Sequence, residues 1–166
     1  MKKAAFLLFA FLIVFTSCED TRNTLHEKYN QLTQRTDSLK TAHGKIAGMH
    51  EAVSDEKDAL QERLNDMQIA DSSALAHLSR HEFLLEKQET LLGSMEELIQ
   101  THKNFEKEYE ADNTSDVELE AKLKELKTNY NEITSNLNDI HSELKRIEED
   151  QKTIRKGIQT YKGVDN

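Results

Sequence analysis

The chain has no proline and no tryptophan, and its 166 residues include only five glycines and one cysteine. One cysteine cannot form an internal disulfide framework or a cysteine-based zinc cluster. The absence of proline argues against a loop-rich or all-β fold and favours long helices, because proline interrupts helices. The chain is also acidic, with a formal charge of -9. It has no basic block, which excludes a typical nucleic-acid binder.

The N-terminal residues differ in composition from the rest of the chain. Two lysines precede an uninterrupted apolar run over residues 4–15, and small residues follow that run. A basic start, a short apolar core and small residues before a cut site are typical of a secretory signal peptide. The run is shorter than the roughly 20 residues that a membrane-spanning helix needs. Residues 1–17 are therefore predicted to be a signal peptide and not a permanent membrane anchor.

The sequence Phe15-Thr16-Ser17-Cys18 resembles the lipobox of bacterial lipoproteins, whose signal is cut directly before a cysteine. The resemblance covers residues 1–18. It departs from the commonest pattern in Phe15, where leucine is usual, and in this it is similar to lipoproteins of Bacteroidota. It implies that Cys18 receives a diacylglycerol on its thiol and a third acyl chain on its amine, enough for stable anchoring. The alternative is an ordinary secretory signal with an incidental cysteine.

Glu19 and Asp20 follow the cysteine and bear on the location. In some enteric bacteria an acidic residue next to the lipidated cysteine retains the protein at the inner membrane. In Bacteroidota-type lipoproteins an acidic stretch at this place is associated with export to the cell surface. The resemblance implies a location in the bacterial cell envelope. It favours the outer membrane and leaves the periplasmic and surface faces open.

Removal of residues 1–17 leaves 18–166 as the mature chain and sharpens its composition. Two lysines are lost, so the formal charge changes from -9 to -11, and four of the six phenylalanines are lost as well. A compact globular core is hard to build from the few large apolar residues that remain. Elongated helix packing and disorder are the two arrangements that fit such a composition.

The repeat in the C-terminal segment favours helix packing over disorder. Apolar residues alternate at spacings of four and three from Leu119 to Tyr161, and Gln151 is the one polar position among them. This repeat is typical of a coiled coil, and disorder does not produce it. Gln151 is interpreted as a residue that specifies register or partner. Ser115 and Glu118 have the spacing of a capping box at the helix start.

The first mature segment carries two seven-residue series. The apolar series is Leu25, Leu32, Leu39, Ile46, Val53, Leu60 and Met67. The mixed series, of which four positions are polar, is Tyr29, Thr36, His43, His50, Lys57 and Leu64. Gly44 and Gly48 lie in the same stretch, and glycine costs about 1 kcal/mol in a helix. The sequence therefore predicts a bend or soft spot between residues 43 and 54.

The middle segment has adjacent leucine pairs seven residues apart, which give a broad apolar face suited to two partner helices. Three helices are expected, over about residues 21–67, 74–110 and 115–161. Short connectors make sequential helices antiparallel. The predicted fold is therefore all-α: an elongated antiparallel three-helix bundle, running up-down-up, whose middle helix contacts both others. Self-association through the C-terminal coiled-coil positions is the alternative.

Seven histidines raise the question of a metal site. His77 and His81 are four apart, the spacing of two ligands on one helix face. No third ligand is evident beside them, so both are expected to face solvent and no metal site is assigned. His43 and His50 could be paired ligands, a pH-sensitive soft spot or ordinary polar coiled-coil residues, and the last interpretation is favoured.

The sequence contains no zinc-protease motif, no Gly-x-Ser-x-Gly and no phosphate-binding glycine loop. We therefore expect no enzymatic activity and no cofactor other than the lipid on Cys18. The leading hypothesis is a lipid-anchored coiled-coil envelope protein that acts as a binding, spacer or scaffold protein. It would contact the membrane through its lipid and a protein partner, or a second copy, through its helical faces, with no nucleic acid.

Two other functions fit the same sequence. The first is a periplasmic or surface chaperone or carrier for an apolar client, with an opening at residues 36–57. The second is a metal-binding lipoprotein that uses His77 and His81.

Overall fold

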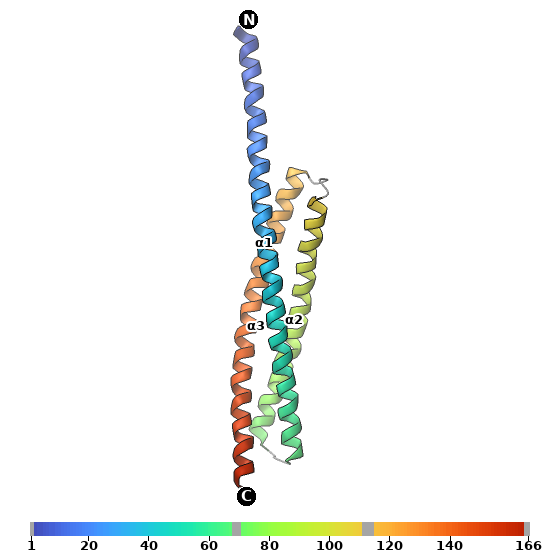
Figure 1. Cartoon of the computed structure of the whole chain (residues 1–166), viewed down its shortest axis with the longest axis vertical. Coiled ribbons are helices and arrows are strands. Elements are labelled where there is room, and N and C mark those ends of the chain that lie inside the picture. Colours follow the sequence, from blue (N-terminus) through green and yellow to red (C-terminus); the bar gives the residue numbers. More distant parts are fainter. Residues whose placement is uncertain (1, 68–70, 111–114, 165–166) are drawn as a thin grey trace.

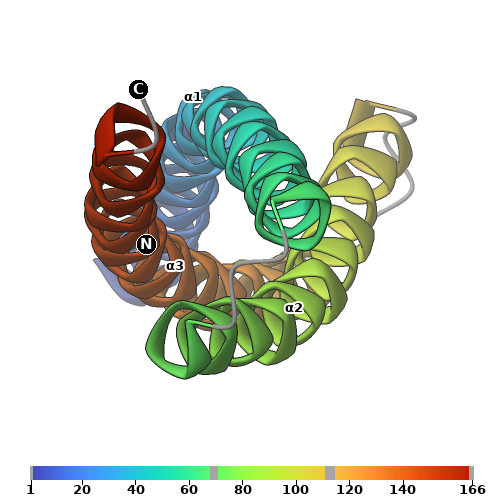
Figure 2. The same ribbon diagram turned by 90° about the horizontal axis from the view of Figure 1, so that it is seen from below.

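The computed structural model describes residues 2–67, 71–110 and 115–164, and the side chains of residues 22–67, 71, 73–109 and 115–161. The chain forms three long helices, α1 (Lys2–Asp66), α2 (Ser72–Glu110) and α3 (Asp116–Val164), and no strand occurs within these ranges. Figure 1 shows an elongated rod in which α1 and α3 run in the same direction and α2 runs against both. Seen end-on, the three helices surround a common axis (Figure 2). The prediction of an all-α three-helix bundle is confirmed.

The second and third helices begin and end within three residues of their predicted bounds. The first helix differs, because α1 begins at Lys2 and its backbone continues without interruption through the apolar run. No proline or glycine lies between residues 4 and 43 to end it. Figure 1 shows the N-terminal part of α1, in blue, projecting beyond the ends of the other two helices. None of the helices in the described part of the chain is both long enough and apolar enough to span a membrane.

Side chains cap the starts of α2 and α3. The Asp71 carboxylate accepts hydrogen bonds from the backbone amides of Ser73 and Ala74, at 3.0 and 3.1 Å. At α3, the Glu118 carboxylate accepts from the Ser115 backbone amide at 3.1 Å, and the Ser115 hydroxyl accepts from the Glu118 amide at 3.4 Å. The predicted capping box is therefore confirmed. Hydrogen bonds from the Ser115 side chain and backbone lower the pKa of Glu118.

The core extends along the rod and is built from heptad positions. The apolar series of α1 is buried from Leu25 to Leu60, and the coiled-coil positions of α3 are buried or half-buried from Leu119 to Ile158. Tyr161, the last of those positions, is 52% exposed. The most extensive helix–helix interface joins α1 and α3, and the least extensive joins α2 and α3. The middle helix contacts both others as predicted, but the two interfaces that α1 forms are more extensive than the interface between α2 and α3.

The mixed series of α1 faces α2 and contacts it through polar groups. His43 and His50 each place Nε2 near a backbone carbonyl of α2, at 3.0 Å from Leu92 O and 2.9 Å from Leu85 O. Because a carbonyl oxygen only accepts, both rings donate through Nε2–H. One heptad earlier, the hydroxyl of Thr36 lies 3.2 Å from Nδ1 of His102. His43 and His50 are seven residues apart on α1, and their acceptors Leu92 and Leu85 are seven residues apart on α2.

The helix does not break at the bend or soft spot predicted between residues 43 and 54, because α1 is helical without interruption through this stretch. His43 and His50 find acceptors on α2, so they do not weaken the interface as unpaired polar groups would. Ile46 and Val53 pack in the core on the neighbouring face. The space beside Gly44 and Gly48 is open, so neither glycine marks a close approach.

Candidate functional site

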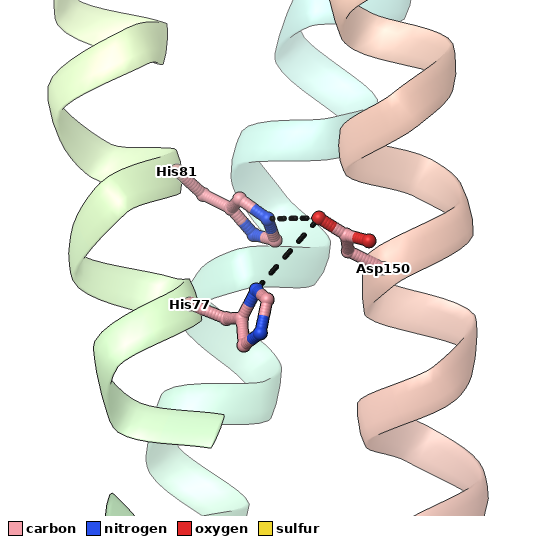
Figure 3. Close-up of side chains that lie close together, drawn as sticks. All are labelled: His77, His81 and Asp150. Atoms are coloured by element: carbon pink, nitrogen blue, oxygen red, sulfur yellow. Dashed lines mark hydrogen bonds and ion pairs between the residues drawn. The ribbon is translucent and has the colours of Figure 1, made fainter. Parts of the chain in front are cut away.

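Three potential metal ligands converge near the C-terminal end of the rod, opposite the projecting part of α1. His77 and His81 lie in the first turns of α2, and Asp150 lies on α3 (Figure 3). Asp150 Oδ2 is 3.3 Å from His81 Nε2 and 3.8 Å from His77 Nδ1. The three ligand atoms all lie within 4.8 Å of one another. Figure 3 shows the two rings pointing toward the carboxylate from one side.

The two histidines have different environments. The side chain of His77 is 49% exposed and that of Asp150 is 52% exposed, whereas His81 is only 2% exposed. The expectation that both histidines face solvent is therefore wrong for His81. The buried positions of α2 alternate at spacings of four and three from Ala74 to His102, and Phe105 follows three residues later; between the two ends they are Leu78, His81, Leu85, Gln88, Leu92, Met95 and Ile99. His81 occupies one of these positions, and so do the polar side chains of Gln88 and His102.

Burial also controls the charge of His81. Desolvation lowers the pKa of His81, and this effect outweighs the hydrogen bond with Asp150, which raises it. The charges of His77 and Arg80 lower it further. At neutral pH the ring is therefore uncharged and can offer a lone pair. The other ring nitrogen, Nδ1, is buried without a hydrogen-bond partner among the described residues.

The site opens into a groove between the start of α2 and the end of α3. His77 and Asp150 line this groove together with Gly157 and Tyr161. A side chain at Gly157 would meet nothing within 4 Å, so the space beside the glycine is open. The carboxylate and the exposed ring of His77 are accessible to solvent and to small ligands from this groove.

The sequence prediction missed Asp150 because it lies 69 residues from His81. Only the alignment of α2 against α3 brings the two together. The same alignment is visible one heptad along, where Gln88 Nε2 donates to Glu143 at 2.9 Å. Gln88 is seven residues after His81, and Glu143 is seven before Asp150. A search for carboxylates at the matching heptad position of α3 could have found the third ligand, given that register.

The structure does not make His43 and His50 a ligand pair. Each ring donates to its own carbonyl on α2, seven residues from the other. They are polar residues of a helix interface, as the sequence interpretation favoured. The opening proposed for residues 36–57 would have to break these contacts and expose Leu39, Ile46 and Val53, which belong to the main core cluster.

The backbone of Cys18 belongs to α1, in the part that precedes the packed core. Its side chain and those of the predicted signal peptide lie outside the described side chains. Leu25 is the first core residue among those described. Comparisons of the chain with models of protein families, with curated proteins and with solved structures found no match.

Proposed function

We propose that this protein is a lipid-anchored helical rod of the bacterial cell envelope that acts by binding, spacing or scaffolding and not by catalysis. The proposal starts from Cys18, the single cysteine, which directly follows the small residues at the end of the apolar run. In the proposed maturation the chain is cut between Ser17 and Cys18, and acyl chains on Cys18 enter the outer membrane. Two or three acyl chains suffice for stable anchoring.

The observation that carries the proposal is that the N-terminal part of α1 projects beyond the ends of the other two helices (Figure 1). Among the described side chains, which begin at residue 22, Leu25 is the first core residue. A cut before Cys18 would therefore shorten the projecting part of α1 and leave every described core residue in place. The seven residues from Cys18 to Leu25 span about 10 Å as a helix, so Leu25 would lie close to the headgroups.

The dimensions of the bundle support a spacing role. α2 has 39 residues and α3 has 49. At 1.5 Å per residue, these helices are about 60 and 75 Å long. A rod anchored at its Cys18 end would hold its far end at roughly that distance from the bilayer. Tethering, adhesion or the positioning of a partner needs such a reach and needs no reactive groups.

The proposed partner is a protein or a second copy of this chain, and not a nucleic acid. Phe83 and Val117 are large apolar side chains that are 68% and 80% exposed, on different helices. Each is a possible contact point, and substitution of either by serine would show which face a partner uses. The formal charge of -9 would repel the phosphates of a nucleic acid, which supports a protein partner.

Metabolic labelling tests the anchor. Cells that express the full chain are grown with an alkyne analogue of palmitate, and the protein is purified and tagged. Wild type should carry the label and the Cys18→Ala variant should carry none. Thr16→Ala, which keeps a small residue before the cysteine, is the matched control and should remain labelled. Equal labelling of wild type and Cys18→Ala would overturn the assignment of Cys18.

A further inference from the structure

We propose that His77, His81 and Asp150 form a Zn²⁺ site that joins α2 to α3 at the end of the rod far from Cys18. This inference goes beyond the anchoring role, since the site and the anchor lie at opposite ends of the bundle. Hydrogen bonding alone does not explain the arrangement. Nδ1 of His77 is 3.8 Å from Asp150 Oδ2, which is beyond hydrogen-bond distance, yet the ring points at the carboxylate.

Two of the three distances between ligand atoms are close to those of tetrahedral coordination. Zn²⁺ binds histidine nitrogen and carboxylate oxygen at about 2.0–2.2 Å, so neighbouring ligand atoms lie about 3.3–3.6 Å apart. The distances from Asp150 Oδ2 to the two ring nitrogens are 3.3 and 3.8 Å, and all three ligand atoms lie within 4.8 Å of one another. Small rotations of the exposed side chains of His77 and Asp150 would bring all three atoms onto one face of a tetrahedron. Two imidazoles and one carboxylate are a donor set that Zn²⁺ accepts.

The fourth position would face the groove that Gly157 leaves open. Sites with three protein ligands and one open position bind water or an incoming ligand there, whereas structural zinc sites use four protein ligands. His81 would coordinate through Nε2 and carry its proton on Nδ1, which has no acceptor among the described residues. The hydrogen bond that usually supports a coordinating histidine is therefore missing there. We expect the bound ion to exchange with solution.

Zinc at this place would strengthen the weakest interface of the bundle. α2 and α3 contact each other less than either contacts α1. Their polar links in the described part of the chain are Gln88 with Glu143 and the two histidines with Asp150. An ion bound by residues of both helices would couple them directly, and it would neutralise part of an acidic surface.

The test is calorimetric titration of ZnCl₂ into the full chain in a mild detergent at pH 7.5. Every protein carries Cys18→Ser, because a free thiol would itself bind zinc. The two test variants are His77→Ala and Asp150→Asn. Both residues are about half exposed, so both variants should fold, and circular dichroism checks this. The matched control is His26→Ala, an exposed histidine on α1 outside the site.

The reference protein and His26→Ala should bind one ion per chain. The two variants should bind zinc at least about 100-fold more weakly, because each lacks a direct ligand. Mutation of a residue that only hydrogen-bonds a ligand already lowers metal affinity about 10–100-fold. Zn²⁺ should also raise the thermal unfolding midpoint of the reference protein and of His26→Ala, but not that of either variant. Absence of binding to the reference protein, or equal binding by all four proteins, would overturn the site.

Discussion

Gln151 on α3 donates a hydrogen bond from Nε2 to the backbone carbonyl of Val53 on α1, at a distance of 2.8 Å. The glutamine is 1% exposed and is the one polar position in the coiled-coil repeat of α3. Every heptad of α1 has a backbone carbonyl at the equivalent place, so this hydrogen bond satisfies the buried amide without selecting one alignment by itself. The interpretation of Gln151 as a register- or partner-specifying residue stays a prediction.

Gln151→Ala should lower the free energy of unfolding by about 1–3 kcal/mol, because it removes a buried hydrogen bond and leaves a cavity. Gln151→Met keeps the volume, and should therefore cost less than the alanine variant. Urea unfolding followed by circular dichroism measures both. Gln159→Ala, an exposed glutamine of the same helix, is the control and should change stability little. An unchanged midpoint for Gln151→Ala would contradict a structural role for this contact.

Stability should fall as the pH is lowered from 7.5 to 5.5. Burial lowers the pKa of His81 and of His102 in the folded state, and the opposing charge of Glu125 does not offset this at His102. Below the usual histidine pKa of about 6.5 the unfolded chain takes up protons that the folded chain does not, so acid favours unfolding. The stability contributed by neutral histidine is present above pH 6.5 and is lost below it.

Thermal unfolding at several pH values measures this effect. A His102→Gln variant should show a weaker pH dependence than wild type, whereas His26→Gln, at an exposed position, should retain it. Gln keeps a polar side chain near Thr36, the partner of His102. Identical pH profiles for wild type and His102→Gln would show that burial of this ring does not govern the dependence.

The Asp71 cap of α2 should contribute about 1 kcal/mol to the free energy of unfolding. The Asp71 carboxylate satisfies the amides of Ser73 and Ala74, which have no acceptor within the helix. Asp71→Ala should therefore lower the free energy of unfolding by about 0.5–2 kcal/mol, and Asp71→Asn should change it little, since asparagine caps equally well. Urea unfolding of the two variants checks the difference. Equal destabilisation by alanine and asparagine would show that charge, and not capping, is what matters.

Hydrogen exchange distinguishes a continuous α1 from the opening that a chaperone would need. Amides at residues 43–54 should be as protected as those at residues 133–147, because both stretches are uninterrupted helix and belong to one core cluster. Mass spectrometry of peptides after exchange measures this. Rapid exchange confined to residues 43–54 would contradict the structure and favour the chaperone or carrier hypothesis.

Much of the fold was predictable from heptad spacing, because burial of one helix face requires that spacing and little else produces it. The helix number, the ends of α2 and α3 and the capping box of Ser115 and Glu118 follow from local sequence. The continuity of α1 through residues 43–54 does not follow from local sequence, because the polar groups of His43 and His50 are satisfied by carbonyls on another helix. Local sequence contains no information about such distant acceptors.

Of the candidate site, the histidine pair could be predicted from the sequence and the carboxylate could not. The spacing of His77 and His81 is a local signal, whereas Asp150 depends on the alignment of α2 with α3. Helices with repeating heptads have several alignments of similar contact area, so sequence alone leaves this one undetermined. The burial of His81 was missed for a related reason. Its place in the α2 repeat is recognisable only if polar residues are allowed among the buried positions.

The intact mass of the protein purified from cell membranes tests the lipid anchor most directly. The purified chain should begin at Cys18, lack residues 1–17 and carry the added mass of two or three acyl chains with their glycerol. Fragmentation should place the whole addition on Cys18. A mass equal to the unmodified chain, or a cut at another residue with no lipid on Cys18, would contradict the proposal.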